Sequence, residues 1–518
     1  MPILGNFIKG SIFLGNNLKK VRKAKPQKWQ EKVLFKLLNK AKFTEVGVAY
    51  KFEEISKGLF VSKRKTIYQD FKSNTPIFDY NSIYNLWWHR SRNGEPDIAW
   101  PGKVKYFALS SGTSEASSKA IPVTADMLKA IHNTSIAQII SLGEFRELPP
   151  VVFEKSYLML GGCTELNRVG GHFEGDLSGI TTAKIPFWFE KFYKPGFRIS
   201  QEKNWEKKLS QIVSQAPTWD ISFVAGVPAW IQIIFERIIE TYKLKNIHEM
   251  WPNLTAFGWG GVSLEPYRAS FSKLLDTEKP FFYLETYLAS EGFFAYQNEP
   301  EKGLKLVLNR GIFFEFIPFN DDNFDEEGNL RPNPETLMVH QTTENTEYAI
   351  LVSTCAGAWR YLVGDTVMFK DSQTAEIVIT GRTKHFMSLC GEHLSVDNLN
   401  KAVVEVSKEI GVEITEFTLI GEKLDKMFGH KWYFGCSEIV DKNLLISKID
   451  ARLKDLNDDY AVERLHALTS VDAEVLPVNV FYDYMKVQGK IGGQNKFPRV
   501  LKGKMQTDWL SFLASTKA

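Results

Sequence analysis

Apolar and polar positions along the first two thirds of the chain follow the pattern of short strands alternating with amphipathic helices. Residues 221–224 form an apolar run, and beyond the turn at 226–228 the apolar spacing becomes helical over 229–242. A second helix is predicted from Pro122 to about Leu142. Further strands are predicted at 151–160, 254–259 and 281–284. Strands followed by helices favour a parallel or mixed sheet with helices on its faces.

The middle of the chain is richer in strands than in helices. Strand patterns next to turns recur over 303–318 and 347–370, which predicts an additional antiparallel sheet or a β-barrel-like portion. Between them, the acidic stretch 320–327 has the composition of a solvent-exposed loop.

The pattern changes near residue 384. Beyond it we predict a helix at 396–410, strands at 414–422 and 431–439, a helix at 443–457, a strand at 475–484 and then a basic, glycine-rich tail. This is a compact α+β pattern, and about 130 residues is a normal size for a separate small domain. We therefore expect two domains, residues 1–384 and 385–518.

The first fifty residues are strongly basic, with eleven Lys and Arg against two acidic residues. Helical apolar spacing from Val33 to Leu38 predicts a helix that packs on the body of the protein by one face. Binding to a membrane surface or a polyanion is the alternative for such a basic stretch. The segment 27–60 as a whole is predicted to be helical, with breaks at Gly47 and Gly58.

The overall composition is that of a globular protein, since 44% of the 518 residues are hydrophobic and 24% are charged. The net charge is only +3, which gives no indication of nucleic acid binding. No stretch reaches the roughly 18–20 apolar residues of a membrane span, and the N-terminus lacks the pattern of a secretory signal. Four widely separated cysteines fit a reduced, cytoplasmic protein, and no Cys or His spacing indicates a zinc site.

The most informative segment for function is 110–119, which reads Ser-Ser-Gly-Thr-Ser-Glu-Ala-Ser-Ser-Lys. Its hydroxyls and backbone N–H groups can bind an anion, and the flexible side chain of Lys119 can bring a positive charge to that anion. The spacing of a Walker A loop is absent. Because serine-rich and glycine-rich loops are also ordinary turns, other segments must decide its role.

Three later segments complete a possible nucleotide site, although each could also be an ordinary turn. The paired glycines in 258–261 follow an apolar strand, so a flat ring can approach the backbone there. In the next segment, Tyr287 can stack on a base and Glu291 can bind Mg²⁺. The carboxylate of Asp365 can accept hydrogen bonds from both hydroxyls of a ribose, because it presents two acceptor oxygens.

Taken in this order, the segments resemble the adenylate-forming superfamily, which includes acyl-CoA synthetases, peptide-synthetase adenylation domains and firefly luciferase. Within it, the chain resembles the acyl-acid amido synthetases, the auxin-responsive-promoter family, in its bacterial form. The resemblance spans roughly the whole chain. It is carried by the motifs at 110–114, 226–230, 287–291, 361–365 and 496–499.

The resemblance implies an α/β fold in two parts. The large N-terminal domain would combine mixed or parallel sheets, flanked by helices, with a β-barrel-like portion. The C-terminal domain would be a small, mobile α+β unit that carries the adenylation lysine. Lys384 lies where the superfamily has its hinge, so the small domain would rotate there between two half-reactions.

The resemblance also implies roles for individual residues, with ATP as substrate and Mg²⁺ bound through it. The phosphates would be bound by Ser110, Ser111, Gly112, Thr113, Ser114 and Lys119. The rest of the nucleotide would be bound by Gly260, Gly261, Tyr287, Ser290 and Asp365. Glu291 would bind the magnesium ion, and together with Lys496 it would act in catalysis. The acyl-acid pocket would include Val227, Pro228 and Trp230.

The implied activity is a ligase reaction on a small carboxylic acid and an amino acid. A monomer is the default expectation for the chain. The acid would be activated as an acyl-adenylate with release of pyrophosphate, and the amine would then displace AMP. An acyl-CoA ligase and a non-catalytic nucleotide-binding homologue are the alternatives. Two positions depart from the family pattern. In the serine-rich loop, Ala116 stands where many members have glycine, and Glu115 beside it adds an acidic group. Leu362 stands where an arginine is common in the plant proteins. Arg360 lies two residues before Leu362.

Overall fold

The chain forms two compact units in the computed structural model. The model describes residues 25–61, 67–110, 119–185, 187–325, 328–384, 387, 389, 392, 394–424, 427–466, 468–490 and 496–516. The first unit takes in the described residues of Met1–Gly261, Asp276–Pro318 and Glu335–Val378, and the second those of Val262–Leu275, Phe319–Pro334 and Ile379–Ala518. Two internal segments therefore belong to the C-terminal unit. The domain boundary at Lys384 stays a prediction.

One large sheet of eleven strands dominates the first unit. Its parallel part is formed by β3 (Ser156–Met159), β6 (Tyr193–Lys194), β7 (Ile221–Gly226), β8 (Ala256–Trp259) and β9 (Phe282–Ala289). Its other strands are β10 (Gly292–Gln297), β11 (Leu304–Leu306), β12 (Ile312–Pro318), β13 (Glu347–Thr354), β14 (Tyr361–Asp371) and β15 (Glu376–Arg382). The predicted antiparallel portion is thus present, and it continues the parallel strands through β9 within one sheet.

A smaller sheet of the first unit has the strand order β2–β1–β5–β4. It is formed by β1 (Tyr106–Ser110), β2 (Lys119–Val123), β4 (Asn167–Val169) and β5 (His172–Gly175). The sequence did not predict this sheet. Its importance lies in the β1–β2 connection, since that connection is the serine-rich loop.

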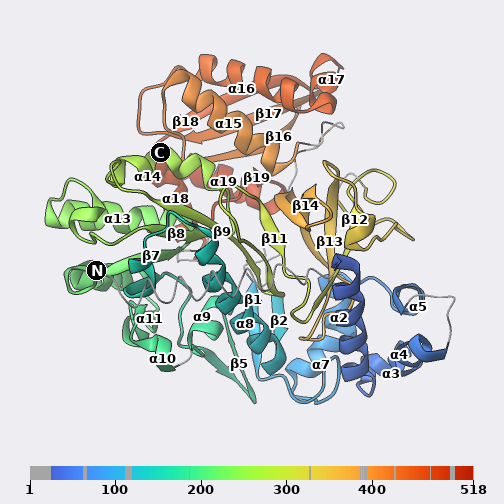
Figure 1. Cartoon of the computed structure of the whole chain (residues 1–518). Helices are drawn as coiled ribbons and strands as arrows, with labels where there is room; N and C mark the ends of the chain where they lie inside the picture. Colours follow the sequence, from blue (N-terminus) through green and yellow to red (C-terminus); the bar gives the residue numbers. More distant parts are fainter. Residues whose placement is uncertain are drawn as a thin grey trace. The chain divides into compact units, whose positions relative to one another are not determined.

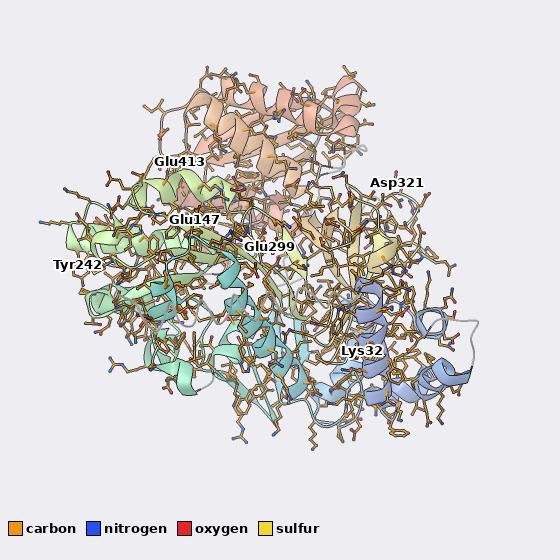
Figure 2. The ribbon with its side chains drawn as sticks, viewed as in Figure 1. Lys32, Glu147, Tyr242, Glu299, Asp321 and Glu413 are labelled. Atoms are coloured by element: carbon orange, nitrogen blue, oxygen red, sulfur yellow. The ribbon has the colours of Figure 1, made fainter. Side chains whose placement is uncertain are left out.

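The amphipathic helices of the first unit lie close to their predicted positions. These are α8 (Ala125–Ser141) and α13 (Pro228–Tyr242), whereas α12 (Trp205–Gln215) was not predicted. Helix α13 buries Trp230, Ile234 and Ile238 on one face, as its 3.6-residue spacing requires. At the C-terminal end of α13, Tyr242 Oη donates a hydrogen bond to Val213 O in α12 at 3.1 Å (Figure 2).

The basic N-terminal region forms three helices, α2 (Pro26–Ala41), α3 (Glu45–Ala49) and α4 (Phe52–Val61). The apolar face of α2 is buried and packs near β12, which confirms the predicted packing by one face. The predicted breaks are wrong, because Gly47 and Gly58 both lie inside helices. The true boundary is set by Thr44, whose side chain accepts a hydrogen bond from Gly47 N and so caps α3.

The second unit has its own sheet, in the order β18–β17–β16–β19, with helices packed on its faces (Figure 1). The strands are β16 (Glu416–Leu424), β17 (Met427–Gly435), β18 (Leu468–Leu476) and β19 (Val500–Leu501). Alternation along β17 sends Trp432 and Phe434 into a core with α15 (Val396–Ile410) and α16 (Lys442–Leu456). Tyr433 points to the other face, where its ring meets Trp509 edge-to-face. Helices α15 and α16 confirm the prediction.

The end of the chain differs from the prediction. The predicted strand 475–484 is wrong, because β18 ends at Leu476 and α18 (Val478–Val487) begins after Pro477. Burial of Phe481, Tyr484 and Met485 follows the spacing of a helix, not of a strand. The predicted basic tail contains a further helix, α19 (Gly503–Thr516), which buries Trp509 and Leu513. None of the described helices is long and apolar enough to cross a membrane.

Candidate functional site

The serine-rich loop is described only at its two ends. Four predicted phosphate-binding positions lie outside the described residues: Ser111, Gly112, Thr113 and Ser114. Ser110 ends β1 and pairs with Lys119, which begins β2, so the loop leaves and re-enters the sheet at adjacent points. Lys119 Nζ lies 5.3 Å from the centroid of the Tyr80 ring, at a distance typical of a cation–π contact.

Tyr287 and Asp365, predicted to bind the nucleotide, are joined directly. Tyr287 Oη donates a hydrogen bond to Asp365 Oδ2 at 2.6 Å. Asp365 belongs to a bulge in β14, where residues 363–365 face the single residue Ile350 of β13. Gly364 adopts a φ of +89° in this bulge, a conformation that glycine accepts without strain. A bulge changes the direction of side chains along a strand, which sets the orientation of Asp365.

A second bulge lies beside Tyr287. The strand predicted at 281–284 continues to Ala289, so Tyr287 is part of β9 and not of a loop that follows it. Phe294 is the extra residue where β10 pairs with β9, and its ring packs edge-to-face on Tyr287 with centroids 5.0 Å apart. Tyr287 is only 6% exposed. Its phenol ring is therefore held in place by packing as well as by Asp365.

The glycine pair is attached to the same strand. A Cβ at Gly260 would lie 2.5 Å from the carbonyl oxygen of Thr286, so only glycine fits this approach of two backbones. Thr286 Oγ1 donates a hydrogen bond to Trp259 O at 2.8 Å. Thr286 was not among the predicted site residues, although its place next to Tyr287 in the motif points to it. Gly260 and Gly261, where the sequence predicts that a flat ring such as adenine can approach the backbone, therefore adjoin the Tyr287–Asp365 pair through β9. We call this position the Gly260–Gly261 slot.

Ser290 and Glu291 form the two-residue turn between β9 and β10. Glu291 is buried, with 8% of its surface exposed. The next residue, Gly292, lies against α8, since a Cβ there would be 3.3 Å from Met127 Sδ. Helix α8 follows β2, whose first residue is Lys119. The turn that carries Glu291 thus packs on the helix that follows the lysine end of the serine-rich loop.

A short segment before the small sheet links β14 to the same loop. Phe78 N donates to Arg360 O at 3.0 Å, and Leu362 N donates to Phe78 O at 2.8 Å. Two residues later, Tyr80 Oη accepts a hydrogen bond from Ala120 N at 2.8 Å. Sequence reasoning missed both aromatic residues, because they lie in a stretch without helix or strand periodicity. They connect the strand of Asp365 to the residue that follows Lys119.

Arg360 has a structural role and does not replace the arginine missing at position 362. Its guanidinium is 5% exposed and pairs with Glu315, which is fully buried, with Nε 3.0 Å and 3.1 Å from the two carboxylate oxygens. The same guanidinium donates to Lys72 O and Thr75 O. These contacts fix the first residue before the 361–365 motif. We infer that the side chain of Arg360 is not available to a nucleotide.

The predicted acyl-acid residues lie at the start of α13. Val227 and Pro228 are buried, and the buried ring of Trp230 packs edge-to-face on Trp205 with centroids 4.9 Å apart. These contacts pack the start of α13 against the start of α12. The assignment of an acid pocket to it stays a prediction.

The two predicted lysines of the C-terminal region belong to the second unit. Lys384 is exposed and follows β15, and Lys496 is exposed and precedes β19. Their assigned roles as hinge and adenylation residue stay predictions.

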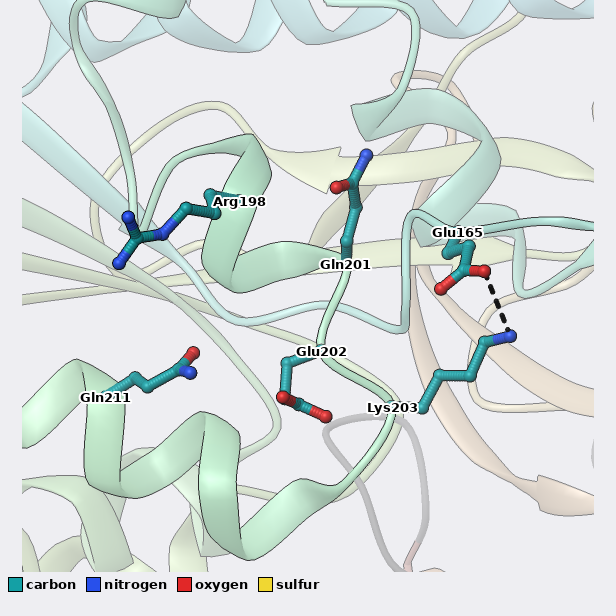
Figure 3. A pocket seen from close by; sticks show the side chains of 6 residues that line it. All are labelled: Glu165, Arg198, Gln201, Glu202, Lys203 and Gln211. Carbon is teal, nitrogen blue, oxygen red and sulfur yellow. Dashed lines mark ion pairs between the residues drawn. The ribbon is translucent and has the colours of Figure 1, made fainter.

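A shallow polar cavity of about 370 Å³ lies elsewhere in the first unit (Figure 3). Its lining is Glu165, Arg198, Gln201, Glu202, Lys203 and Gln211. Lys203 and Glu165 form an ion pair at 3.3 Å, and both are well exposed. None of the predicted site residues lines this cavity, and we assign no role to it.

Sequence models of one family match three successive parts of the chain. They are described as the GH3 family N-terminal domain, matching residues 16–209, the GH3 family central domain, matching 305–382, and the GH3 family C-terminal domain, matching 397–504. Together they cover more than half of the chain, in the order of the family. The chain belongs to the GH3 family.

Solved structures show the same fold. The chain is similar to "GH3.15 acyl acid amido synthetase", with a TM-score of 0.74, 14% identity and 94% of each chain covered. A complex, "AtGH3.15 acyl acid amido synthetase in complex with 2,4-DB", gives a TM-score of 0.73 at 15% identity, covering 94% of this chain and 93% of the other. A 2-hydroxyisobutyryl-CoA ligase in complex with 2-HIB-AMP gives 0.57 at 12% identity, covering 94% and 90%.

These similarities show that this GH3 chain has the mixed α/β fold of adenylate-forming enzymes, with large sheets flanked by helices and a C-terminal α/β part. No curated protein sequence matches the chain.

We expect the Gly260→Ala variant to bind ATP at least about tenfold more weakly, because the added Cβ must push residues 260–261 away from β9. The contacted atom is the Thr286 carbonyl oxygen, which cannot rotate away as a side chain does. Isothermal titration with ATP and Mg²⁺ measures the change. Gly171→Ala is the control, since nothing lies within 4 Å of a Cβ at that position. Equal affinities for both variants would contradict the role given to Gly260.

Proposed function

We propose that this GH3 protein is an ATP-dependent acyl-acid amido synthetase. The observation that carries the proposal is the hydrogen bond between Tyr287 and Asp365, each of which lies at a bulge of the large sheet. Tyr287 is in β9, the strand that leads to Glu291 and that also contacts Gly260. Membership of the GH3 family, and the likeness to an acyl acid amido synthetase over nearly the whole chain, support it.

The nucleotide would bind by its ribose and base at this pair. A carboxylate can accept up to about four hydrogen bonds, so the bond from Tyr287 to Asp365 is compatible with two more from a ribose diol. The adenine ring would lie against Tyr287 and the backbone at Gly260 and Gly261, with Ser290 at the edge. The phosphates would extend to the serine-rich loop, between Ser110 and Lys119.

The residues near the phosphates fit a magnesium ion that comes with ATP. Among the described residues, no three His, Cys, Asp or Glu side chains are grouped to hold a metal ion. Mg²⁺ commonly takes one or two carboxylates and completes its coordination with phosphate oxygens and water. The buried carboxylate of Glu291 suits this arrangement, and the ion would supply neutralisation of phosphate charge.

The first half-reaction would form an acyl-adenylate. A carboxylate oxygen of the acid attacks the α-phosphorus of ATP, the bond to the bridging oxygen breaks, and pyrophosphate leaves. Lys496 would stabilise the negative charge that gathers on the α-phosphate in the transition state. A pocket for the acid would lie at the start of α13, with Val227, Pro228 and Trp230.

The second half-reaction would form the amide. The neutral amine of an amino acid attacks the acyl carbonyl carbon, loses a proton, and AMP leaves with its electron pair. Rotation of the C-terminal domain, residues 385–518, about Lys384 would take Lys496 out of the way between the two steps. We propose a monomer that acts in the cytoplasm. The free cysteines Cys163, Cys355 and Cys436 fit a reducing compartment.

We expect the Asp365→Asn variant to bind ATP about tenfold to a hundredfold more weakly, since hydrogen bonds to a charged acceptor contribute about 1.5–3 kcal/mol. Tyr287→Phe removes only the bond to Asp365 and should cost less. The binding affinity for ADP is compared with that for 2′-deoxy-ADP in the parent and in each variant. If Asp365 binds the ribose diol, the difference in affinity between the two nucleotides should be smaller in the Asp365→Asn variant. Asp371→Asn, farther along β14, is the control. An unchanged preference for the ribose diol in Asp365→Asn would refute the role.

The proposal is tested by measuring pyrophosphate release with ATP and Mg²⁺ across a panel of aryl, indole and fatty acids. Each acid is assayed with no acceptor, with mixed amino acids and with CoA. Release of AMP with an amide product, found only with an amino acid, would support the amido synthetase. Stimulation by CoA alone would favour the thioester-forming ligase that the 2-hydroxyisobutyryl-CoA ligase fold makes the second candidate. ATP binding without any turnover would instead indicate a non-catalytic nucleotide-binding protein.

A further inference from the structure

The segment Lys496-Phe497-Pro498-Arg499 begins with an exposed lysine that is followed by two residues buried in the core. Lys496 is exposed, whereas Phe497 and Arg499 are buried, at 5% and 9% exposure. The ring of Phe497 packs against Phe481 and Trp509, with centroids 4.9 Å and 5.2 Å away. Pro498 fixes its own φ between them. The backbone under Lys496 is therefore held on its C-terminal side by two buried side chains.

The guanidinium of Arg499 is bound to the start of β16 and to the residue before it. Nη1 donates to Glu416 Oε2 at 2.8 Å and to Phe417 O at 3.2 Å, and Nη2 donates to Thr415 O at 3.2 Å. The guanidinium carbon lies 4.4 Å from the centroid of the Phe417 ring. Burial opposes the positive charge, but Glu416 more than offsets it, so the pKa of Arg499 is raised. Because both charges are desolvated, removal of either partner would leave an uncompensated buried charge.

The same carboxylate holds a segment from a distant part of the chain. Tyr267 Oη donates to Glu416 Oε1 at 2.6 Å, and Glu416 is only 2% exposed. Burial, followed by the charge of Glu416, raises the pKa of Tyr267 well above its ordinary value, so the phenol remains the donor. Tyr267 lies in Val262–Leu275, an internal segment that belongs to the second unit. This segment begins at the residue after Gly261.

We infer that Tyr267, Glu416 and Arg499 form a positioning cluster, which holds Lys496 for the adenylation step and fastens the chain that follows the Gly260–Gly261 slot to the same rigid body. The inference rests on the proposed function. Glu416 is the centre of this cluster, because Oε1 accepts a hydrogen bond from Tyr267 and Oε2 accepts one from Arg499. Tyr482 Oη also donates to Oε1, at the longer distance of 3.5 Å. None of the three residues needs to touch the substrates. Their effect on the reaction passes through Lys496 and through the segment after Gly261.

The test compares two conservative variants, Glu416→Gln and Tyr267→Phe, in acid-dependent pyrophosphate release. A displacement of about 1 Å in a catalytic group can cost about a hundredfold in rate, so we expect Glu416→Gln to lower kcat for adenylation about tenfold to a hundredfold. We expect the KM for ATP to change less than kcat. Tyr267→Phe should have a smaller effect in the same direction. Amide formation from a synthetic acyl-adenylate, which does not need Lys496, should stay near the parent rate.

A double-mutant cycle separates positioning from general destabilisation. In a Lys496→Ala background, the further change Glu416→Gln should have little additional effect on adenylation, because the group that it positions is already absent. The matched control is Lys273→Ala. Lys273 and Glu413 form an ion pair that joins the segment 262–275 to the chain just before β16, and Lys273 is 64% exposed. Such an exposed pair should contribute little to stability. Glu413 is labelled in Figure 2. Multiplicative losses in the cycle, or equal losses in both half-reactions, would overturn the inference.

Hydrogen exchange measured by mass spectrometry gives a readout that does not depend on activity. Glu416→Gln should increase exchange in peptides that cover 262–275 and 496–502 together, and leave α15 protected. Increased exchange in only one of the two segments would refute the coupling. If the parent protein activates no acid in the panel, the proposed function fails, while this measurement still decides whether Glu416 joins the two segments.

Discussion

The Lys496→Ala variant should release pyrophosphate in the presence of acid about 10²–10³-fold more slowly than the parent, because removal of one group that stabilises transition-state charge commonly costs this much. ATP binding should remain within about twofold, since the base and ribose contacts are assigned to other residues. The measurement is a continuous pyrophosphate assay at saturating acid, together with isothermal titration of ATP.

Lys504→Ala is the matched control for that variant. Lys504 is another exposed lysine of the same unit, near the start of α19, so its removal changes the net charge equally. We expect no more than about a twofold change, as for an ordinary surface substitution. If Lys496→Ala and Lys504→Ala behaved alike, the assignment of Lys496 to adenylation would fail. A large loss of ATP affinity in Lys496→Ala would point instead to a role in binding the ground state.

The functional motifs are visible in the sequence as short segments whose residues and order resemble those of one family. Asp365 and Tyr287 were identified in this way, and the structure joins them by a hydrogen bond. The two bulges that bring them together were not predictable. A bulge depends on the register between two strands, which local sequence does not determine.

Helices with a clear apolar face were predicted well, and contacts between distant segments were not. Helix α15 has the predicted bounds, because its apolar residues follow a strict helical spacing between Ser395 and Gly411 at its ends. The error at 475–484 arose where a strand changes to a helix at Pro477 within one apolar run. No local pattern shows that 262–275 packs with the C-terminal unit, since its partners Glu413 and Glu416 lie far away in sequence.

The Arg360→Met variant should lower the free energy of unfolding of the first unit by about 3–5 kcal/mol, the usual cost of leaving one charge of a buried ion pair without its partner. Glu315 would remain in the core at 0% exposure, with Tyr68 Oη at 3.2 Å as a neutral donor. The variant also loses the hydrogen bonds that hold Lys72 O and Thr75 O. Urea unfolding, followed by tryptophan fluorescence, measures the change in midpoint and slope.

The double variant Arg360→Met with Glu315→Met tests whether the loss comes from the unpaired charge. Replacing both partners of a buried pair by apolar groups of similar size is often nearly neutral, so the double variant should be more stable than the sum of the single changes predicts, by about 1–3 kcal/mol. Additive losses would mean that the pair itself contributes nothing and that packing alone explains Arg360→Met. Since Arg360 has a φ of +42° and directly precedes the 361–365 motif, it also fixes the entry to that strand. We therefore expect the double variant to regain stability but to keep a weakened affinity for ATP, because methionine cannot bind the carbonyls of Lys72 and Thr75, which lie just before the Phe78 backbone that pairs with the start of β14.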